Sequence, residues 1–398
     1  MSGDLARRAA LMLGVASLTA CALPIREAAV PRDRTLQATV LGIPNERFFP
    51  GQGSGPITVE YHAALRRRMA YLGLGNGASV PPLDLLAVSG GGEDGAFGAG
   101  LLNGWTRHGT RPEFVLVTGV STGALTAPFA FVGPDYDMAL KRVYTDVTLA
   151  DITIMRNLVA AVFDDGMADT APLYRTIGRE LDTRMIERIA EGCRQGRLLL
   201  IGTTDLDAQL PVTWNIGAIA ASGHPRAAEV IHKVLLASAA IPGAFPPVLF
   251  DVTVDGRPHQ ELHVDGGAIY QAFLYPNSVT EIRRANLAAR RPVMPARAWL
   301  IRNGRLDANW ASTDRRTLSI AQRAVETMIA SSGFNDSNRI WLNAVRDSVE
   351  FRMAFIGADF TTQLPAPFDQ TYMRALYEYG FERASRGYDW APRPPFNT

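Results

Sequence analysis

The sequence has little cysteine, no excess of either charge and no long apolar run. Of its 398 residues only Cys21 and Cys193 are cysteines, and there is no CxxC pair or His/Cys cluster. This excludes the usual ligand patterns of a structural zinc site. The 40 basic and 39 acidic side chains nearly balance, so no broad electrostatic field points to nucleic acid. We therefore expect a globular protein with no metal site and no nucleic-acid partner.

The N-terminal apolar stretch, residues 9–18, is too short to cross a bilayer, which takes about 20 apolar residues. Arg7 and Arg8 precede it, and Leu-Thr-Ala-Cys follows at residues 18–21. This arrangement resembles a bacterial lipoprotein signal, which implies cleavage before Cys21 and acyl chains that anchor it to the membrane of the cell envelope. Ala22 at the next position favours the outer membrane. The alternative is an ordinary secretory signal and a secreted or periplasmic protein.

The rest of the chain divides into segments of different pattern. We expect a signal peptide at residues 1–20, a tether and N-terminal extension at 21–82, a core at 83–280 and a continuation of the same domain at 281–398. Apolar runs predict strands at residues 83–89, 114–118, 198–203, 212–219, 262–264, 298–302 and 351–356. Amphipathic periodicity predicts helices at residues 57–72, 96–108, 122–131, 172–181, 183–195, 227–237, 318–331 and 370–386. Such an alternation is typical of an α/β fold, with a parallel or mixed sheet covered on both faces.

A glycine-rich motif, GGGEDG at residues 90–95, directly follows the first predicted strand and precedes a helix. Glycines let backbone N–H groups approach a ligand, and the helix N-terminus favours negative charge. The loop is thus suited to a phosphate or to the oxyanion of acyl transfer. Its GxGxxG spacing also fits a dinucleotide site with Glu113 as the ribose ligand. A tight turn without a ligand is the third interpretation.

A second motif, GVSTG at residues 119–123, lies between a predicted strand and a predicted helix. In this setting GxSxG indicates a nucleophile elbow, in which Gly119 and Gly123 permit a sharp turn that lifts the Ser121 hydroxyl clear of the sheet. The helix N-terminus behind the turn stabilises developing negative charge. Ser121 is therefore the candidate nucleophile of a hydrolase.

A serine nucleophile needs a base, and none of the six histidines lies in a recognisable catalytic motif. The alternative base is Asp265, which ends a short predicted strand and precedes Gly266 and Gly267. Asp-Gly-Gly is also a common turn sequence. At this point a Ser-His-Asp triad that uses His263 or another histidine stays open beside a Ser-Asp dyad.

The glycine-rich loop, GxSxG and Asp-Gly-Gly, in this order, together resemble the patatin-like phospholipase family. The segment ASAAIPGAFPPV at residues 237–248 also agrees, and the resemblance covers about residues 84–280. It implies a three-layer α/β/α fold around a central, mostly parallel sheet. It also implies a serine lipid acyl hydrolase of the phospholipase or esterase type, whose substrate is a lipid or another acyl ester.

The resemblance further assigns roles to single residues. Ser121 attacks the ester carbonyl and Asp265 accepts its proton, with no metal or organic cofactor. Backbone amides of Gly90, Gly91 and Gly92 hold the oxyanion. Gly95, like the glycines beside Ser121 and Asp265, supports the shape of its motif.

One position departs from the family pattern. Asp94 stands before the last glycine of the first motif, where the family usually has Arg or Lys. A cation there would favour an anionic head group or the oxyanion, whereas Asp94 does not. A catalytically silent lipoprotein that binds lipid or a partner is therefore kept as an alternative. Residues 151–166, rich in apolar side chains, are expected to form either a lid that faces lipid or a core helix.

Overall fold

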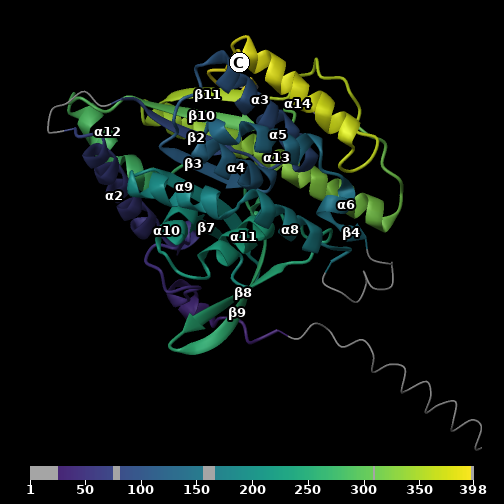
Figure 1. The fold of residues 1–398 in the computed structure, drawn as a ribbon, viewed down its shortest axis with the longest axis horizontal. Coiled ribbons are helices and arrows are strands. Elements are labelled where there is room, and N and C mark those ends of the chain that lie inside the picture. The colour runs from purple at the N-terminus through teal and green to yellow at the C-terminus, as the bar shows by residue number, and fades with distance from the viewer. Residues whose placement is uncertain (1–25, 75–80, 156–165, 308–309, 396–398) are drawn as a thin grey trace, which may run out of the picture.

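The computed structural model describes residues 26–74, 81–155, 166–307 and 310–395. Cys21, the predicted signal peptide and residues 156–165 of the apolar segment lie outside these ranges. Within the described residues the centre of the fold is a mixed sheet of nine strands with helices on both faces (Figure 1). The three-layer α/β/α architecture expected from the sequence is thus confirmed.

Five neighbouring strands of the sheet run parallel. In spatial order they are β6 (Leu198–Asp205), β3 (Leu116–Val120), β2 (Leu83–Val88), β10 (Ala296–Arg302) and β11 (Glu350–Phe355). Antiparallel strands β7 (Leu210–Asn215) and β1 (Arg47–Phe48) extend the sheet beyond β6. The hairpin of β8 (Val248–Val254) and β9 (Arg257–Asp265) also joins at β6, where Asp265 pairs with Thr203.

Successive side chains of the central strands enter two separate hydrophobic layers. In β2, Leu86 and Val88 join one layer and Ala87 the other. Because both faces are buried, such a strand appears in the sequence as a continuous apolar run. The first layer is covered by α3 (Gly95–His108), α4 (Thr122–Val132), α5 (Asp137–Thr145), α8 (Ala171–Glu180), α9 (Thr183–Arg194), α10 (Ile216–Ala221), α11 (Ala227–Ser238) and α14 (Gln370–Ser385). The second is covered by α2 (Gly55–Tyr71) and α13 (Thr317–Arg346).

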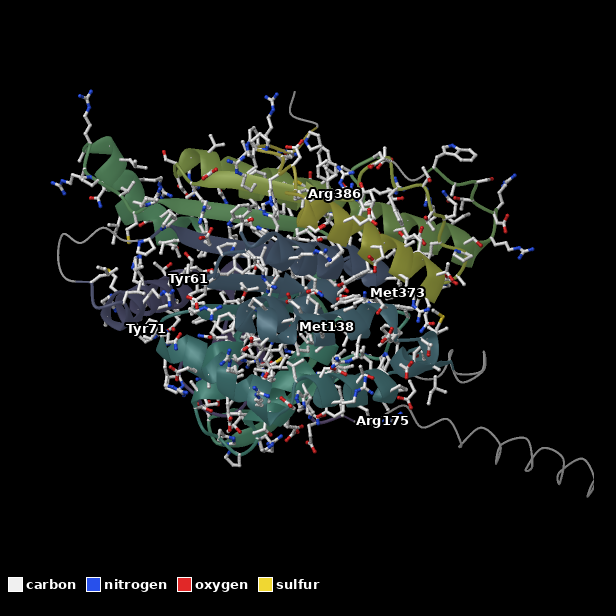
Figure 2. The ribbon with its side chains drawn as sticks, turned by 45° about the horizontal axis from the view of Figure 1, so that its top comes forward. Tyr61, Tyr71, Met138, Arg175, Met373 and Arg386 are labelled. Atoms are coloured by element: carbon white, nitrogen blue, oxygen red, sulfur yellow. The ribbon has the colours of Figure 1, made fainter. Side chains whose placement is uncertain are left out.

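The described part of the N-terminal extension packs against the body. Its helix α2 packs on the sheet through Ile57 and Ala64, and Figure 2 labels two of its tyrosines. The Tyr61 hydroxyl donates to the Leu274 carbonyl oxygen at 2.5 Å, whereas Tyr71 at the helix end is 55% exposed. The extension thus supplies both an edge strand and a covering helix to the domain.

Three predicted boundaries were wrong for tertiary reasons. The strand expected at 212–219 ends at Asn215, whose side chain caps α10 by accepting from the Ala218 N–H. The short strand predicted at 262–264 is the end of the longer strand β9. The first half of β9 is exposed or half-buried, and its polar side chains do not give the apolar run that predicts a strand. Helix α13 continues to Arg346 instead of ending at the predicted residue 331. Its second half packs against β10 and β11 through Ile340 and Ala344. The remaining short elements are α6 (Leu149–Ile152), β4 (Ile154–Met155), β5 (Ala168–Asp169) and α12 (Glu281–Ala288).

The topology brings the three sequence motifs to one edge of the sheet. The carboxyl ends of β2, β3 and β10 lie side by side, and the segments that follow them begin at Ser89, Ser121 and Asn303. Strand β9 reaches the same edge from the opposite direction and ends there at Asp265. Ligands commonly bind outside the carboxyl ends of parallel strands. Within the described part of the chain, no helix combines the length and apolarity that a membrane span needs.

Candidate active site

Ser121 lies on the sharp turn between β3 and α4, with φ 55° and ψ −127°. A positive φ is strained at a residue other than glycine, so the surrounding chain must enforce it. A Cβ on Gly119 would lie 2.4 Å from the Gly123 carbonyl oxygen, and one on Gly123 would lie 2.2 Å from that of Val88. Both positions therefore require glycine. The turn leaves Ser121 7% exposed at the edge of the sheet.

A buried serine ties this turn to the neighbouring strand. The Ser121 N–H donates to Ser238 Oγ at 3.0 Å, and the Ser238 hydroxyl donates to the Gly202 carbonyl oxygen of β6 at 2.7 Å. Ser238 is fully buried at the end of α11. Its segment was recognised in the sequence, but the contact with the elbow was not predicted.

The glycine-rich loop lies beside the elbow. A Cβ on Gly90 would come within 3.1 Å of the Ser121 Cβ, and the Gly90 N–H donates to the Gln271 carbonyl oxygen at 3.0 Å. Gly91 and Gly92 have φ values of 156° and 56°. Within the described residues their N–H groups have no hydrogen-bond acceptor. Two free N–H groups next to a serine are the donors that an oxyanion needs.

The end of β10 holds this loop in place. The Asn303 N–H donates to Ser89 Oγ and its side-chain amide donates to the Ser89 carbonyl oxygen, both at 2.9 Å. Asn303 Oδ1 accepts the Gly98 N–H at 3.1 Å, and Arg302 donates to the Gly90 carbonyl oxygen at 3.3 Å. Sequence reasoning missed both side chains. The signal that could have found them is their place at the carboxyl end of a predicted parallel strand.

Gly91 provides a test of this loop. A Cβ there would lie 2.0 Å from the Asn303 carbonyl oxygen, so Gly91→Ala must displace the loop. We expect kcat for ester hydrolysis to fall by about 10²–10³-fold, the usual effect of losing one oxyanion donor. The matched control is Gly109→Ala, which also has positive φ but has open space around its Cβ. Equal kcat values for the two variants would contradict the assignment of Gly91.

Asp265 is 4% exposed and lies against Ser121 at the end of β9. Its carboxylate oxygen Oδ1 accepts the Gly267 N–H at 2.7 Å. Burial raises the pKa of Asp265 to about 7, although hydrogen bonds from the Ser121 hydroxyl and the Gly267 N–H oppose the rise. A carboxyl with a pKa near neutrality is suited to accept and return a proton. A Cβ on Gly266 would lie 2.6 Å from the Gly202 carbonyl oxygen, so this turn is also closely packed.

Gln271 links the aspartate turn with the glycine-rich loop. Its side-chain amide donates to the Gly267 carbonyl oxygen at 3.0 Å, and its Oε1 would lie 2.6 Å from a Cβ on Gly90. The Gln271 N–H donates to a carboxylate oxygen of Asp336 on α13 at 2.6 Å. Helix α13 therefore fixes the distance between the two motifs.

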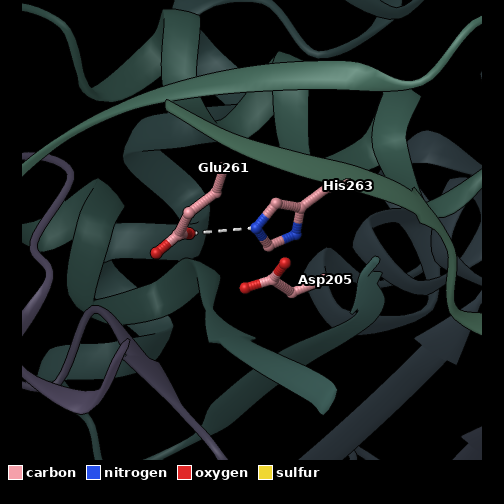
Figure 3. Close-up of side chains that lie close together, drawn as sticks. All are labelled: Asp205, Glu261 and His263. Atoms are coloured by element: carbon pink, nitrogen blue, oxygen red, sulfur yellow. Dashed lines mark hydrogen bonds and ion pairs between the residues drawn. The ribbon is translucent and has the colours of Figure 1, made fainter. Parts of the chain in front are cut away.

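Asp205, Glu261 and His263 form a buried group near Asp265 (Figure 3), and their carboxylate and imidazole atoms lie within 4.8 Å of one another. These atoms are metal ligands by type, but Arg47 of the N-terminal extension bonds both oxygens of Glu261. Burial alone would raise the pKa of Glu261, yet Arg47 and His263 outweigh it and lower the pKa to about 2. A guanidinium thus already neutralises this carboxylate. The group ties the extension to β9.

His263 does not occupy the place of a triad base. Its Nδ1 lies 2.9 Å from Thr203 Oγ1 and its Nε2 lies 3.1 Å from Glu261 Oε2, so both ring nitrogens are engaged away from Ser121. Glu113, the ribose ligand of the dinucleotide interpretation, precedes β3 and pairs with Arg68 at the opposite edge of the sheet. The structure therefore separates it from the glycine-rich loop.

Asp94 and Gly95 lie where the loop enters α3. Asp94 Oδ1 accepts the Tyr372 hydroxyl of α14 at 2.6 Å. Burial raises the pKa of Asp94, opposed by this hydrogen bond and by the charges of Arg302 and Arg305. A Cβ on Gly95 would lie 2.2 Å from Thr122 Oγ1, so glycine allows α3 and α4 to start side by side.

About half of the chain is similar to a known protein family. Residues 86–277 match the family model of the patatin-like phospholipases. No curated protein matches the chain. Among solved structures, the crystal structure of VipD from Legionella pneumophila is similar, with 11% sequence identity and a TM-score of 0.37, over 78% of this chain and 68% of that one. The matched range contains the glycine-rich loop, Ser121 and Asp265. Residues 86–277 are therefore similar to the patatin-like phospholipases, a family of lipid acyl hydrolases.

Proposed function

We propose that this protein is a serine hydrolase that cleaves carboxylic esters of lipids through a Ser121–Asp265 dyad and an acyl-enzyme. One observation carries the proposal. The Ser121 side chain lies against a buried carboxyl with a pKa of about 7, beside two backbone N–H groups that have no acceptor among the described residues. A weak hydroxyl nucleophile needs such a base and such donors at the same time.

The chemistry follows from these positions. Ser121 Oγ attacks the ester carbonyl carbon while Asp265 accepts the hydroxyl proton. The Gly91 and Gly92 N–H groups receive the oxyanion of the tetrahedral intermediate. Its collapse breaks the ester bond, and Asp265 returns the proton to the departing alcohol. Water then attacks the acyl-enzyme, again with Asp265 as the base, and releases the fatty acid with Ser121 regenerated.

The membrane attachment is a separate proposal that rests on the sequence. The lipoprotein-type signal supports acylation of Cys21 and a place in the bacterial cell envelope, on the outer membrane. A lipid anchor would hold the site near ester-linked acyl chains. Asp94 supports esters of neutral rather than anionic head group, because a carboxylate beside the loop repels negative charge.

The test is hydrolysis by the full chain of p-nitrophenyl esters of several chain lengths and of phospholipid vesicles. We expect turnover of the esters, and faster fatty-acid release from vesicles of neutral than of anionic phospholipid. The chain-length profile then defines the acyl preference. If no ester and no vesicle is hydrolysed, the silent binding lipoprotein becomes the better interpretation.

A further inference from the structure

The buried guanidinium of Arg302 is the strongest feature that the mechanism above does not use. Arg302 ends β10, outside the matched residues 86–277, and is 6% exposed. Among the described residues, other arginines with buried side chains have a carboxylate partner: Arg47 pairs with Glu261, Arg111 with Asp137 at 2.9 Å, and Arg197 lies 3.8 Å from Glu113. Among the described residues, no carboxylate lies within 4.0 Å of the Arg302 guanidinium. Burying a charge whose opposite charges lie beyond ion-pair distance is costly, so the position of this guanidinium calls for an explanation.

The guanidinium is directed at the glycine-rich loop. Arg302 Nη1 lies 3.3 Å from both the Ser89 hydroxyl oxygen and the Gly90 carbonyl oxygen, and its Nε has no hydrogen-bond partner. Helix α13 closes over it, since a Cβ on Gly333 would lie 2.5 Å from the Arg302 Cζ. The side chain is therefore held in one place by packing rather than by an ion pair.

The hydrogen bond to Gly90 has a consequence for the next N–H group. Within the described residues all peptide bonds are trans, so the carbonyl of Gly90 and the N–H of Gly91 point in opposite directions. The Ser89 hydroxyl donates to the same carbonyl oxygen at 2.7 Å, so Ser89 and Arg302 together direct the Gly91 N–H to the other side of the loop. A charged donor on the carbonyl also polarises the peptide and strengthens the N–H as a donor.

Two carboxylates lie near the glycine-rich loop, and a cation beside them offsets their negative charge. Asp94 and Asp336 are the charged groups that face Arg302. Asp336 is held by Arg339 at 2.7 Å and by the backbone N–H groups of Gln271 and Ala272. Asp94 accepts the Tyr372 hydroxyl and faces the positive charges of Arg302 and Arg305, and its own charge opposes negative charge on the loop. Arg302 offsets it at the point where the oxyanion develops.

We propose that Arg302 is the positioning cation of the oxyanion loop: it orients and polarises the Gly90–Gly91 peptide, and its charge stabilises the tetrahedral intermediate formed on Ser121. The inference rests on the proposed esterase function and assigns it a residue from outside the matched domain. Arg302 touches the loop and not the substrate. It therefore acts on the transition state more than on substrate binding.

The test compares Arg302→Gln and Arg302→Lys with wild type in the full chain. Each is assayed for ester hydrolysis and for inhibition by an alkyl trifluoromethyl ketone. Ser121 Oγ adds to the carbonyl of this ketone, its proton passes to Asp265, and the adduct holds an oxyanion in the loop. We expect Arg302→Gln to lower kcat about 10²-fold with KM nearly unchanged, and to raise the ketone Ki by a similar factor. Arg302→Lys retains the charge and recovers part of both losses.

The matched control is Arg197→Gln. Arg197 is as buried as Arg302 and also donates to backbone carbonyl oxygens, but it lies at the start of β6, at the opposite edge of the sheet. It should leave kcat and the ketone Ki within about threefold of wild type, although both glutamine variants lower Tm.

Three outcomes separate this inference from the function on which it rests. If wild type hydrolyses no ester and is not labelled by a fluorophosphonate, the proposed function fails and the role of Arg302 fails with it. If wild type is active and folded Arg302→Gln keeps its kcat and ketone Ki, only the role of Arg302 is overturned. If Arg302→Gln does not fold, the test rests on Arg302→Lys. A fall in kcat with a matching rise in the ketone Ki supports the inference, and a fall in kcat without that rise overturns it.

Discussion

Ser121→Ala is expected to lower kcat for ester hydrolysis by on the order of 10⁴-fold or more, since the variant has no atom that can form the acyl-enzyme. The small activity that remains would come from the oxyanion donors and from substrate binding. Folding should be preserved, because alanine keeps the backbone N–H that donates to Ser238. The measurement is steady-state hydrolysis of the best p-nitrophenyl ester, together with Tm.

Covalent labelling gives a second, independent result for the same variant. A fluorophosphonate should modify wild type with a stoichiometry near one and leave Ser121→Ala unlabelled. Ser222→Ala is the matched control, because Ser222 directly follows α10 and its hydroxyl donates to the Ile219 carbonyl oxygen and accepts the His224 N–H, away from the site. It should be labelled and active like wild type. Labelled and active Ser121→Ala would remove Ser121 as nucleophile.

Asp265→Asn is expected to lower kcat/KM by about 10²–10⁴-fold, because an amide cannot accept the Ser121 proton. In wild type the base works only when ionised, and its pKa is raised to about 7. The logarithm of kcat/KM should therefore rise with unit slope up to about pH 7 and level off above it. A profile with its midpoint near the ordinary Asp value of 3.8 would contradict the burial-raised pKa.

The same pKa predicts an effect of opposite sign on stability. Since the folded pKa lies above the unfolded one, protonated Asp265 stabilises the fold fully below about pH 4, and this contribution is lost as pH rises to about 7. The asparagine of Asp265→Asn does not titrate, so the stability of this variant does not fall with pH for this reason. The variant should therefore become more stable than wild type as pH rises, by a few kcal/mol at most. Parallel thermal melts at pH 5 and pH 8 measure the gap, and an equal gap at both would contradict the prediction.

Much of the fold was predictable because both faces of the central strands are buried. Such strands are continuous apolar runs, and α9 is a helix with clear amphipathic periodicity. The catalytic candidates were predictable for a local reason. Gly119 and Gly123 are required by contacts within a few residues of Ser121 or with the adjacent strand, so the motif itself carries the geometry.

The hairpin of β8 and β9 was only partly predictable. Its buried end at residues 262–264 was predicted, but the polar Glu261 and the residues of β9 before it gave no strand signal. Glu261 and His263 are tolerated inside the protein because Arg47, more than two hundred residues away in sequence, supplies the compensating charge. No local pattern in the chain carries that pairing.

The amino-acid sequence by itself determined the α/β class, the elbow at Ser121 and the glycine loop with its free N–H groups, because these depend on neighbours in the chain. Only the tertiary structure decided what surrounds them. Parallel strand order places Arg302 and Asn303 of β10 beside β2, and α13 brings Asp336 to the turn after Asp265. These side chains act through burial and long-range hydrogen bonds. Such interactions exist only when distant segments meet at one edge of the sheet.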